Sequence, residues 1–272
     1  MTRDWRPPGG PYSWPPQPPH TITLPSVTTI LGEGVPKPFL KPWAEKMVAT
    51  YAVDHVDRWN GLPRQDAIDL LKRAPFRFTR SAQVRGSAVH AAIAAHVEGE
   101  TEVDLPEEQE GYFRAALAYL SEQRVTVLRS EACVFSREHG YAGTFDLLQQ
   151  RDGGNLRVFD PEWHKQGHRL GRAFPVEIAD LKTSKAVYPE VALQLAAYAR
   201  ADFIGLDDGT EEPLPQVTRG VIVQLSPDGT YKAVPVELGS DVFDTFLAAK
   251  VLHDWSRGLS RRVLGKPLER AA

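Results

Sequence analysis

Cysteine is almost absent from this chain of 272 residues, in which Cys133 is the single example. A lone thiol cannot form an internal disulfide, and it cannot build a zinc or iron–sulfur site that needs several thiolates. The sequence also lacks any apolar stretch approaching the roughly 18 residues of a membrane span. No apolar run follows a basic start at the N-terminus, so we expect no secretory signal and a cytoplasmic location.

An excess of positive charge is absent as well. Lysine and arginine together number 32 and aspartate and glutamate 35, which gives a net charge of -3. This balance argues against a scaffold that coats nucleic acid over its whole surface. It does not exclude an enzyme that binds DNA locally, because acidic metal ligands themselves lower the total. The hydrophobic content of 42% is ordinary for a globular protein, and the length allows one large core with an added lobe.

Proline is concentrated at the N-terminus, where residues 1–20 contain seven of the 22 prolines. This composition predicts a disordered, proline-rich arm. Trp5, Tyr12 and Trp14 could dock on the body or on a partner, but the composition favours a flexible tail. We expect order to begin at residues 24–31, whose sequence LPSVTTIL is typical of a strand.

Helical periodicity dominates the next part of the chain. Apolar residues recur at spacings of three and four in the segments 37–56, 65–73, 81–100 and 106–123. Ser81 suits the N-cap of the third segment, and Glu107 and Glu108 suit the positive end of the fourth helix dipole. Together with the preceding strand, these helices predict an N-terminal lobe across residues 21–123.

Strand-like patterns dominate the second half. β-branched and aromatic residues predict three successive strands at 125–136, 140–150 and 174–184. Helical spacing returns at 187–206 and at 240–258. Between them, residues 219–237 predict a hairpin that turns at Asp228-Gly229. We therefore expect an α/β fold whose core covers residues 124–258, with a basic C-terminal tail at 259–272.

The clearest chemistry lies in GTFD at 143–146 and in VEIADLKTSK at 176–185. Residues two apart on a strand share a face, so Asp180 and Lys182 are expected to project together. Asp146, at the end of the preceding strand, would complete a pair of carboxylates. Such hard oxygen donors, with the carbonyl between Asp180 and Lys182, suit magnesium or manganese. The alternative interpretation is a surface strand that carries a simple ion pair.

Four more polar residues accompany this pattern. Gln194 and Tyr198 lie four apart, on one face of the helix that follows the D-x-K strand. Glu131 lies in the strand before GTFD, and His90 lies on an upstream helix. Each also has a structural interpretation. His90 could pack on its alanine-rich helix, Tyr198 could fill the core, Gln194 could be a solvated residue, and Glu131 at a strand edge needs no function.

The ordered series G-x-x-x-H, E, G-x-x-D, D-x-K, Q-x-x-x-Y resembles the RecB-like branch of the PD-(D/E)XK nucleases. The chain supplies it through Gly86 and His90, Glu131, Gly143 and Asp146, Asp180 and Lys182, and Gln194 and Tyr198. The opening PSVTTIL, followed by a helix with a tryptophan, is similar to phage-encoded exonucleases and to mitochondrial genome maintenance exonucleases. The resemblance covers residues 24–258. It implies a restriction-endonuclease-like core, in which helices flank a mixed central sheet.

The resemblance also implies a metal site. Asp146 and Asp180 would be the principal ligands of one or two Mg²⁺ or Mn²⁺ ions. His90 would be an additional ligand that reaches over the site from the helical lobe. Glu131 would be an outer carboxylate or a ligand of a second ion. Some relatives carry an iron–sulfur cluster, which this chain cannot hold.

The remaining matches imply catalytic roles. Lys182 would position or deprotonate the attacking water and stabilise charge on the phosphate, and Gln194 and Tyr198 would orient Lys182 or contact the DNA backbone. One departure from the family pattern is a long insertion at residues 151–174 between the two acidic motifs. This segment could be a clamp over DNA or a surface hairpin.

A path for DNA is suggested by positions 70–97, which contain no acidic residue. Five basic residues accumulate there: Lys72, Arg73, Arg77, Arg80 and Arg85. Phe76 and Phe78 lie among them, and rings can stack on bases while cations follow phosphates. The alternative is a solvated basic surface beside a helix.

Together these features predict a metal-dependent DNA exonuclease that hydrolyses phosphodiester bonds from free ends in replication, recombination or end processing. Its partner would be DNA, either single-stranded or an end with a single-stranded portion, and no membrane. A structure-specific endonuclease on the same site is one alternative, and a catalytically silent DNA-binding module of the same fold is another. The presence of Asp146, Asp180 and Lys182 favours an active enzyme.

Overall fold

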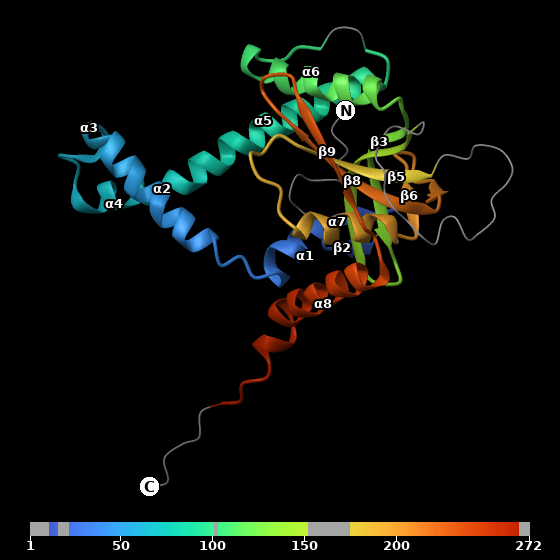
Figure 1. Cartoon of the computed structure of the whole chain (residues 1–272). Coiled ribbons are helices and arrows are strands. Elements are labelled where there is room, and N and C mark those ends of the chain that lie inside the picture. The colour runs from blue at the N-terminus through green and yellow to red at the C-terminus, as the bar shows by residue number, and fades with distance from the viewer. Residues whose placement is uncertain (1–10, 16–21, 101–102, 152–174, 267–272) are drawn as a thin grey trace, which may run out of the picture.

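The computed structural model describes residues 11–15, 22–100, 103–151 and 175–266. N-terminal helices precede a seven-stranded mixed sheet that is flanked by helices, so the predicted α/β class is confirmed (Figure 1). Among the described residues, no helix is both long and apolar enough to span a membrane.

The central sheet has the strand order β7-β6-β3-β4-β5-β8-β9. Its strands are β3 (Val125–Ser136), β4 (Tyr141–Arg151), β5 (Val176–Lys182), β6 (Phe203–Gly205), β7 (Glu211–Pro213), β8 (Val217–Leu225) and β9 (Tyr231–Val236). Neighbouring strands are antiparallel except β5 and β8, which are parallel. The three predicted strands and the hairpin are confirmed, and Gly229 adopts the positive φ of 90° that the β8–β9 turn requires.

Helices cover both faces of this sheet. One face carries α1 (Val27–Gly34), α7 (Glu190–Ala199) and α8 (Ser240–Arg257), and the other carries α5 (Ala74–Val97) and α6 (Glu107–Glu122). Successive residues of β5 alternate between the two layers: Ile178 packs with the first group and Ala179 with the second. The strand that carries the D-x-K motif is therefore enclosed on both sides.

A helical lobe projects from this body (Figure 1). It consists of α2 (Leu40–Asp54), α3 (Val56–Trp59), α4 (Arg64–Lys72) and the N-terminal half of α5. None of the residues of α2, α3 or α4 is buried, which is unusual for helices of a folded domain. The long helix α5 joins this open lobe to the sheet.

The prediction of a strand at residues 24–31 is wrong beyond Leu24. The β-branched run there favours a strand, but the chain forms β2 (Ile22–Leu24) and then α1. Ser26 caps α1 by accepting a hydrogen bond from the Thr29 N–H at 3.0 Å. Burial of Val27 and Ile30 in the core then outweighs the local preference.

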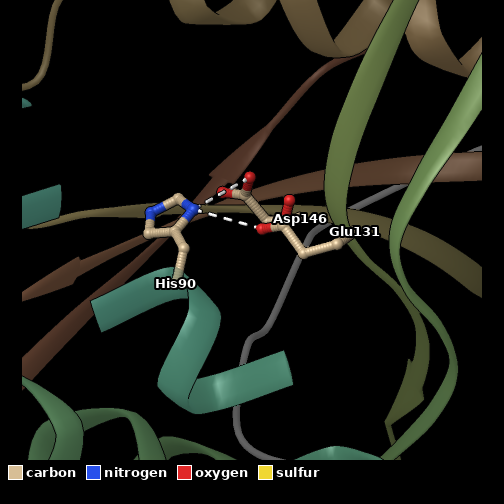
Figure 2. A group of neighbouring side chains, drawn as sticks. All are labelled: His90, Glu131 and Asp146. Atoms are coloured by element: carbon tan, nitrogen blue, oxygen red, sulfur yellow. Dashed lines mark ion pairs between the residues drawn. The ribbon is translucent and has the colours of Figure 1, made fainter. Parts of the chain in front are cut away.

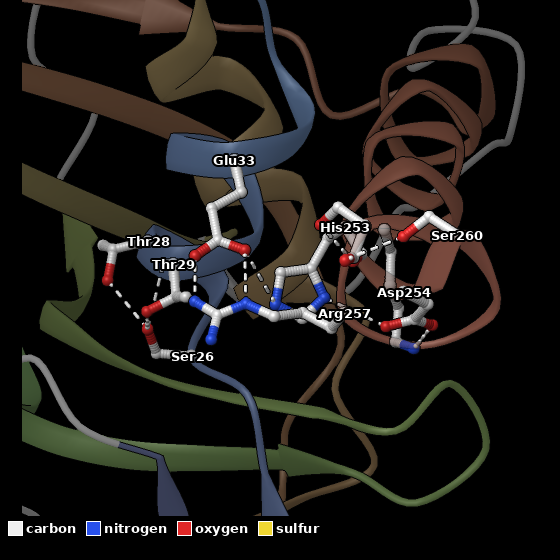
Figure 3. Close-up of polar contacts among 10 residues, drawn as sticks. Ser26, Thr28, Thr29, Glu33, His253, Asp254, Arg257 and Ser260 are labelled. Atoms are coloured by element: carbon white, nitrogen blue, oxygen red, sulfur yellow. Dashed lines mark hydrogen bonds and ion pairs between the residues drawn. The ribbon is translucent and has the colours of Figure 1, made fainter. Parts of the chain in front are cut away.

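Polar contacts also join α1 to α8 (Figure 3). Because α1 directly precedes α2, they hold the point at which the chain enters the helical lobe. Glu33 accepts a hydrogen bond from Nε of Arg257 at 2.9 Å. One turn earlier on α8, Nε2 of His253 lies 3.7 Å from Oε2 of the same carboxylate. Gly34 contacts the carbonyl of Ala249 so closely that a Cβ would not fit. The entry to α2 is therefore tied to the C-terminal helix.

The predicted disordered arm at residues 1–20 is wrong for its described part. β1 (Tyr12–Trp14) pairs antiparallel with β2, and the remaining residues of the arm, apart from 11 and 15, lie outside the described residues. The Trp14 ring is only 1% exposed and packs on Phe135 and Phe203 at centroid distances of 4.8 and 5.7 Å. Burial of a large aromatic side chain overrides the tendency of a proline-rich composition towards disorder.

Two helix boundaries also differ from the prediction. α5 begins at Ala74, so Ser81 lies within the helix and is not its cap. α7 ends at Ala199, and the predicted continuation to residue 206 is replaced by β6. Phe203 and Ile204 pair with β3 and are buried. The pairing and the burial outweigh the helical spacing of the local sequence. The insertion at 152–174 and residues 267–272 of the C-terminal tail lie outside the described residues.

Candidate metal centre

The site forms where β4 and β5 separate. Their pairing runs from Gln150↔Val176 to Leu147↔Ala179 and ends there. At the next position, Oδ2 of Asp146 accepts a hydrogen bond from the Leu181 N–H at 2.6 Å. The carboxylate thus takes the place of a backbone acceptor and is held between the two strands.

His90 reaches the same gap from α5. Figure 2 shows its ring directed from the helix at two carboxylates. Its Nδ1 lies 3.3 Å from Oδ1 of Asp146 and 3.4 Å from Oε1 of Glu131. Its Nε2 lies 3.0 Å from the carbonyl oxygen of Leu181. A carbonyl can only accept, so Nε2 carries a proton and Nδ1 is the atom available to a metal.

Three potential ligands therefore converge from α5, β3 and β4. The ligand atoms of His90, Glu131 and Asp146 all lie within 4.8 Å of one another. Histidine ligands usually donate their second N–H to a carbonyl or carboxylate, as His90 does to Leu181. The donor set and the second hydrogen bond of the imidazole both fit a divalent cation.

Glu131 has a strained backbone. Its φ of 46° lies in the left-handed region, which non-glycine residues rarely adopt. It lies between the cross-strand pairs Ser130↔Leu147 and Ala132↔Phe145, opposite Asp146. Strain of this kind costs on the order of 1–3 kcal/mol and is concentrated at functional sites. This conformation supports a role for Glu131 that the sequence pattern alone left open.

Neighbouring charges shift the pKa values of His90 and Asp146. Burial acts to lower the pKa of His90, but Asp146 and Glu131 outweigh it and hold that pKa well above its ordinary value. Burial acts to raise the pKa of Asp146, whereas His90, Lys182 and the Leu181 N–H hold it below its ordinary value. The protein without metal therefore places one imidazolium beside two carboxylates, and a divalent cation would compensate them better.

Asp180 and Lys182 contact each other as their spacing predicts. Nζ of Lys182 lies 2.8 Å from Oδ1 and 2.8 Å from Oδ2 of Asp180, with hydrogen-bond geometry met at Oδ1. Burial raises the pKa of Asp180 to about 6, with Lys182 opposing the shift and Asp146 adding to it. The Asp180 carboxylate is not part of the group formed by His90, Glu131 and Asp146, and its Oδ1 accepts hydrogen bonds from Lys182 and Gln194. Its role as a metal ligand stays a prediction.

Gln194 and Tyr198 extend this contact from α7, as their spacing of four predicts. Nε2 of Gln194 donates to Oδ1 of Asp180 and to the Tyr198 hydroxyl, both at 3.2 Å. The Tyr198 ring lies on the backbone of Gly143, where a Cβ would overlap the ring. The glycine of the G-x-x-D motif is therefore needed for close packing. Burial raises the pKa of the Tyr198 hydroxyl well above its ordinary value, so it remains a neutral partner for Gln194.

The backbone of Leu181 lies at the centre of the site, a position that the sequence pattern did not predict. Its N–H donates to Asp146 and its carbonyl accepts from His90. The motif pattern indicated the carbonyl as an oxygen ligand, and the structure places it against the imidazole instead. Glu177, on the other face of β5, forms a buried ion pair with Arg151 and takes no part in the cluster.

The five basic residues predicted to bind DNA do not share one environment. Arg77 donates to the Tyr51 hydroxyl at 2.7 Å and to the Leu70 carbonyl at 3.2 Å. Arg85 lies over the ring of Tyr112, at 5.8 Å from its centroid. Arg77 is nevertheless exposed, as are Lys72, Arg73 and Arg80.

No protein-family model matches this chain, and neither does any curated protein sequence.

Proposed function

We propose that this protein is a divalent-metal-dependent DNA exonuclease of the PD-(D/E)XK type. The observation that carries the proposal is the convergence of His90, Glu131 and Asp146 beside the Asp180–Lys182 pair. An isolated D-x-K ion pair on a strand would be unremarkable. Its position at a buried gap, next to an imidazole and two further carboxylates, is what a hydrolytic metal site needs.

The donor set supports Mg²⁺ or Mn²⁺ as the cofactor. Carboxylate oxygens are hard ligands, and one imidazole is compatible with Mn²⁺ in particular. His90 and Asp146 would hold the ion, together with Glu131. When bound, the ion would supply an activated water and neutralise charge on the phosphate.

Lys182 supplies a fixed positive charge in this scheme. Burial acts to lower its pKa, but Asp180 and Asp146 outweigh burial and hold that pKa above its ordinary value. Lys182 is therefore an ammonium at neutral pH and cannot itself take a proton from water. This favours stabilisation of the charge that develops on the phosphate oxygens. Asp180 would orient the ammonium by accepting its hydrogen bond, and Gln194 would in turn hold Asp180 by donating to the same carboxylate.

Action at free DNA ends is supported by the sequence resemblance and by the position of the lobe. α5 carries His90 into the cluster and continues outward into the projecting helices (Figure 1). A strand that follows this helix would reach the metal ligands from one direction. A structure-specific endonuclease on the same site remains the competing proposal, and circular DNA separates the two.

The proposal is tested with end-labelled linear DNA, single- and double-stranded, in Mg²⁺, in Mn²⁺ and in excess chelator. We expect the wild-type protein to shorten the DNA in either metal and to leave it intact in chelator. Asp146→Asn should abolish cleavage, whereas the matched control Asp244→Asn, an exposed position on α8, should retain it. Cleavage that survives in chelator, or in Asp146→Asn, would overturn the proposal.

A further inference from the structure

The face of α5 that carries His90 continues outward without interruption. At 3.6 residues per turn, Phe76, Thr79, Gln83 and Ser87 lie on the same side of the helix as His90, and Arg80 lies at its margin. Phe76 and His90 are about 21 Å apart along the axis, given a rise of about 1.5 Å per residue. One surface of a single helix thus connects the lobe to the candidate metal centre (Figure 1).

Side chains on the opposite side of α5 make contacts with other helices. Phe78 is still 59% exposed but packs edge-on against Trp43, at a centroid distance of 5.9 Å. Arg77 is bonded to Tyr51, and Arg85 lies over Tyr112. These side chains hold α5 to α2 and α6, and so the neighbouring phenylalanines, Phe76 and Phe78, have different environments.

The His90 side of α5 is open. It borders a groove of about 640 Å³ that is lined by Phe76, Thr79, Arg80, Gln83, Val84 and Ser87. Phe76 is 75% exposed there, a large apolar area for a side chain to leave in water. Arg80 is the charged residue among those that line the groove, and the sequence has no acidic residue between positions 70 and 97 that would oppose an anion from α5 itself.

We propose that this groove binds a single strand of DNA and leads it to His90, an inference that rests on the proposed function. One base stacks on the Phe76 ring, and Arg80 contacts a phosphate. Thr79, Gln83 and Ser87 offer hydrogen bonds to the sugar–phosphate backbone. In a duplex both faces of each base are covered by neighbouring bases, so an exposed ring has nothing to stack on except at an end. The occupant is therefore a single strand.

The test measures binding in excess chelator, where no cleavage can occur. The probes are a fluorescein-labelled oligothymidylate, an abasic oligomer of equal length and a duplex, followed by fluorescence anisotropy. Phe76→Ala should weaken binding of the oligothymidylate by roughly 5- to 150-fold, the range for loss of one stacked base. The abasic oligomer should lose far less, because it has no base to stack.

Matched variants separate stacking from charge and from folding. Phe78→Ala, the same substitution on the other side of the same helix, should change binding of the oligothymidylate less than twofold while circular dichroism confirms that it is folded. Arg80→Ala should lower the salt dependence of binding by about 0.7 in the slope of log affinity against log salt, and Phe76→Ala should leave that slope unchanged. Phe76→Trp should restore binding.

The outcomes distinguish this inference from the proposed function. Equal losses in Phe76→Ala and Phe78→Ala, or equal losses for the abasic and base-containing probes, would overturn the strand-binding groove even if the wild type cleaves DNA. A duplex that depends on Phe76 as strongly as the single strand would overturn it too. If binding follows the expected pattern but no metal supports cleavage, the groove stands and the nuclease proposal fails.

Discussion

The ring of Tyr198 rests on the backbone of Gly143 so closely that no Cβ fits between them. The Tyr198 hydroxyl accepts a hydrogen bond from Gln194, which also donates to Asp180. A glycine on β4 therefore sets the position of a contact chain that starts on α7 and ends at a carboxylate of the site. This close packing explains why the first position of the G-x-x-D motif is a glycine.

Gly143→Ala should displace the Tyr198 ring and with it Gln194. We expect a loss of about 1–3 kcal/mol in the free energy of unfolding, which is typical of overpacking, and a loss of cleavage of at least about tenfold. Urea unfolding and a cleavage assay measure the two effects. Gly32→Ala is the matched control, because no atom lies within 4 Å of the added Cβ and alanine favours the helix. Equal effects of the two substitutions would contradict the packing argument.

Metal binding should release a proton at pH 7. The pKa of His90 lies well above its ordinary value because Asp146 and Glu131 outweigh burial, so the imidazole is protonated before the ion binds. Nδ1 must lose that proton to become a ligand, and affinity should therefore rise with pH until the pH exceeds the pKa of His90. Calorimetric titration with Mn²⁺ in two buffers of different ionisation enthalpy measures the release. Identical heats in both buffers would show that His90 does not bind the ion.

Lys182→Ala should separate catalysis from metal binding. An ammonium donates but cannot ligate an ion, so Mn²⁺ affinity should survive while cleavage falls by about 100- to 1000-fold, as for loss of a charge-stabilising donor. Asp180→Ala should reduce both, if Asp180 moves from Lys182 to the ion. Calorimetry and a cleavage assay on the two variants test the assignment, and the same loss of affinity in both would refute it.

Trp14→Ala should destabilise the whole domain although the residue lies in a proline-rich segment. The indole is 1% exposed and packs on Phe135 and Phe203, so its removal should cost about 3–5 kcal/mol. Trp255, which is 45% exposed on α8, is the control, and its replacement should cost much less. Urea unfolding followed by circular dichroism compares the two variants. A change of under about 0.5 kcal/mol in Trp14→Ala would mean that the arm is not part of the folded core.

The strands of the sheet could be predicted from the sequence because their pattern agrees with their environment. Residues 125–136 begin with the β-branched run Val125, Thr126 and Val127 and end with Val134 and Phe135, and β3 has the predicted bounds. Residues 27–34 show the opposite case. Their β-branched composition favours a strand, but the cap at Ser26 and burial against α8 determine a helix. Packing against residues far away in the sequence determines the structure there, and a local sequence pattern does not reveal such packing.

The candidate site was predictable to the extent that its residues lie at fixed spacings. Asp180 with Lys182, and Gln194 with Tyr198, follow from the periods of a strand and a helix. The placement of His90 between Asp146 and the Leu181 carbonyl depends on how α5 crosses the sheet, which no spacing determines. The left-handed backbone of Glu131 is likewise a property of the fold, since nothing in its neighbouring residues requires it.

The most direct test of the nuclease proposal compares linear and covalently closed circular single-stranded DNA of the same sequence, at matched concentration, with Mn²⁺ and with excess chelator. We predict that the linear strand is degraded from its ends in Mn²⁺, that the circle persists, and that neither changes in chelator. Comparable cutting of the circle would replace the exonuclease with an endonuclease on the same residues. Absence of any cleavage in Mn²⁺ or Mg²⁺, with His90, Glu131 and Asp146 intact, would contradict the proposed function itself.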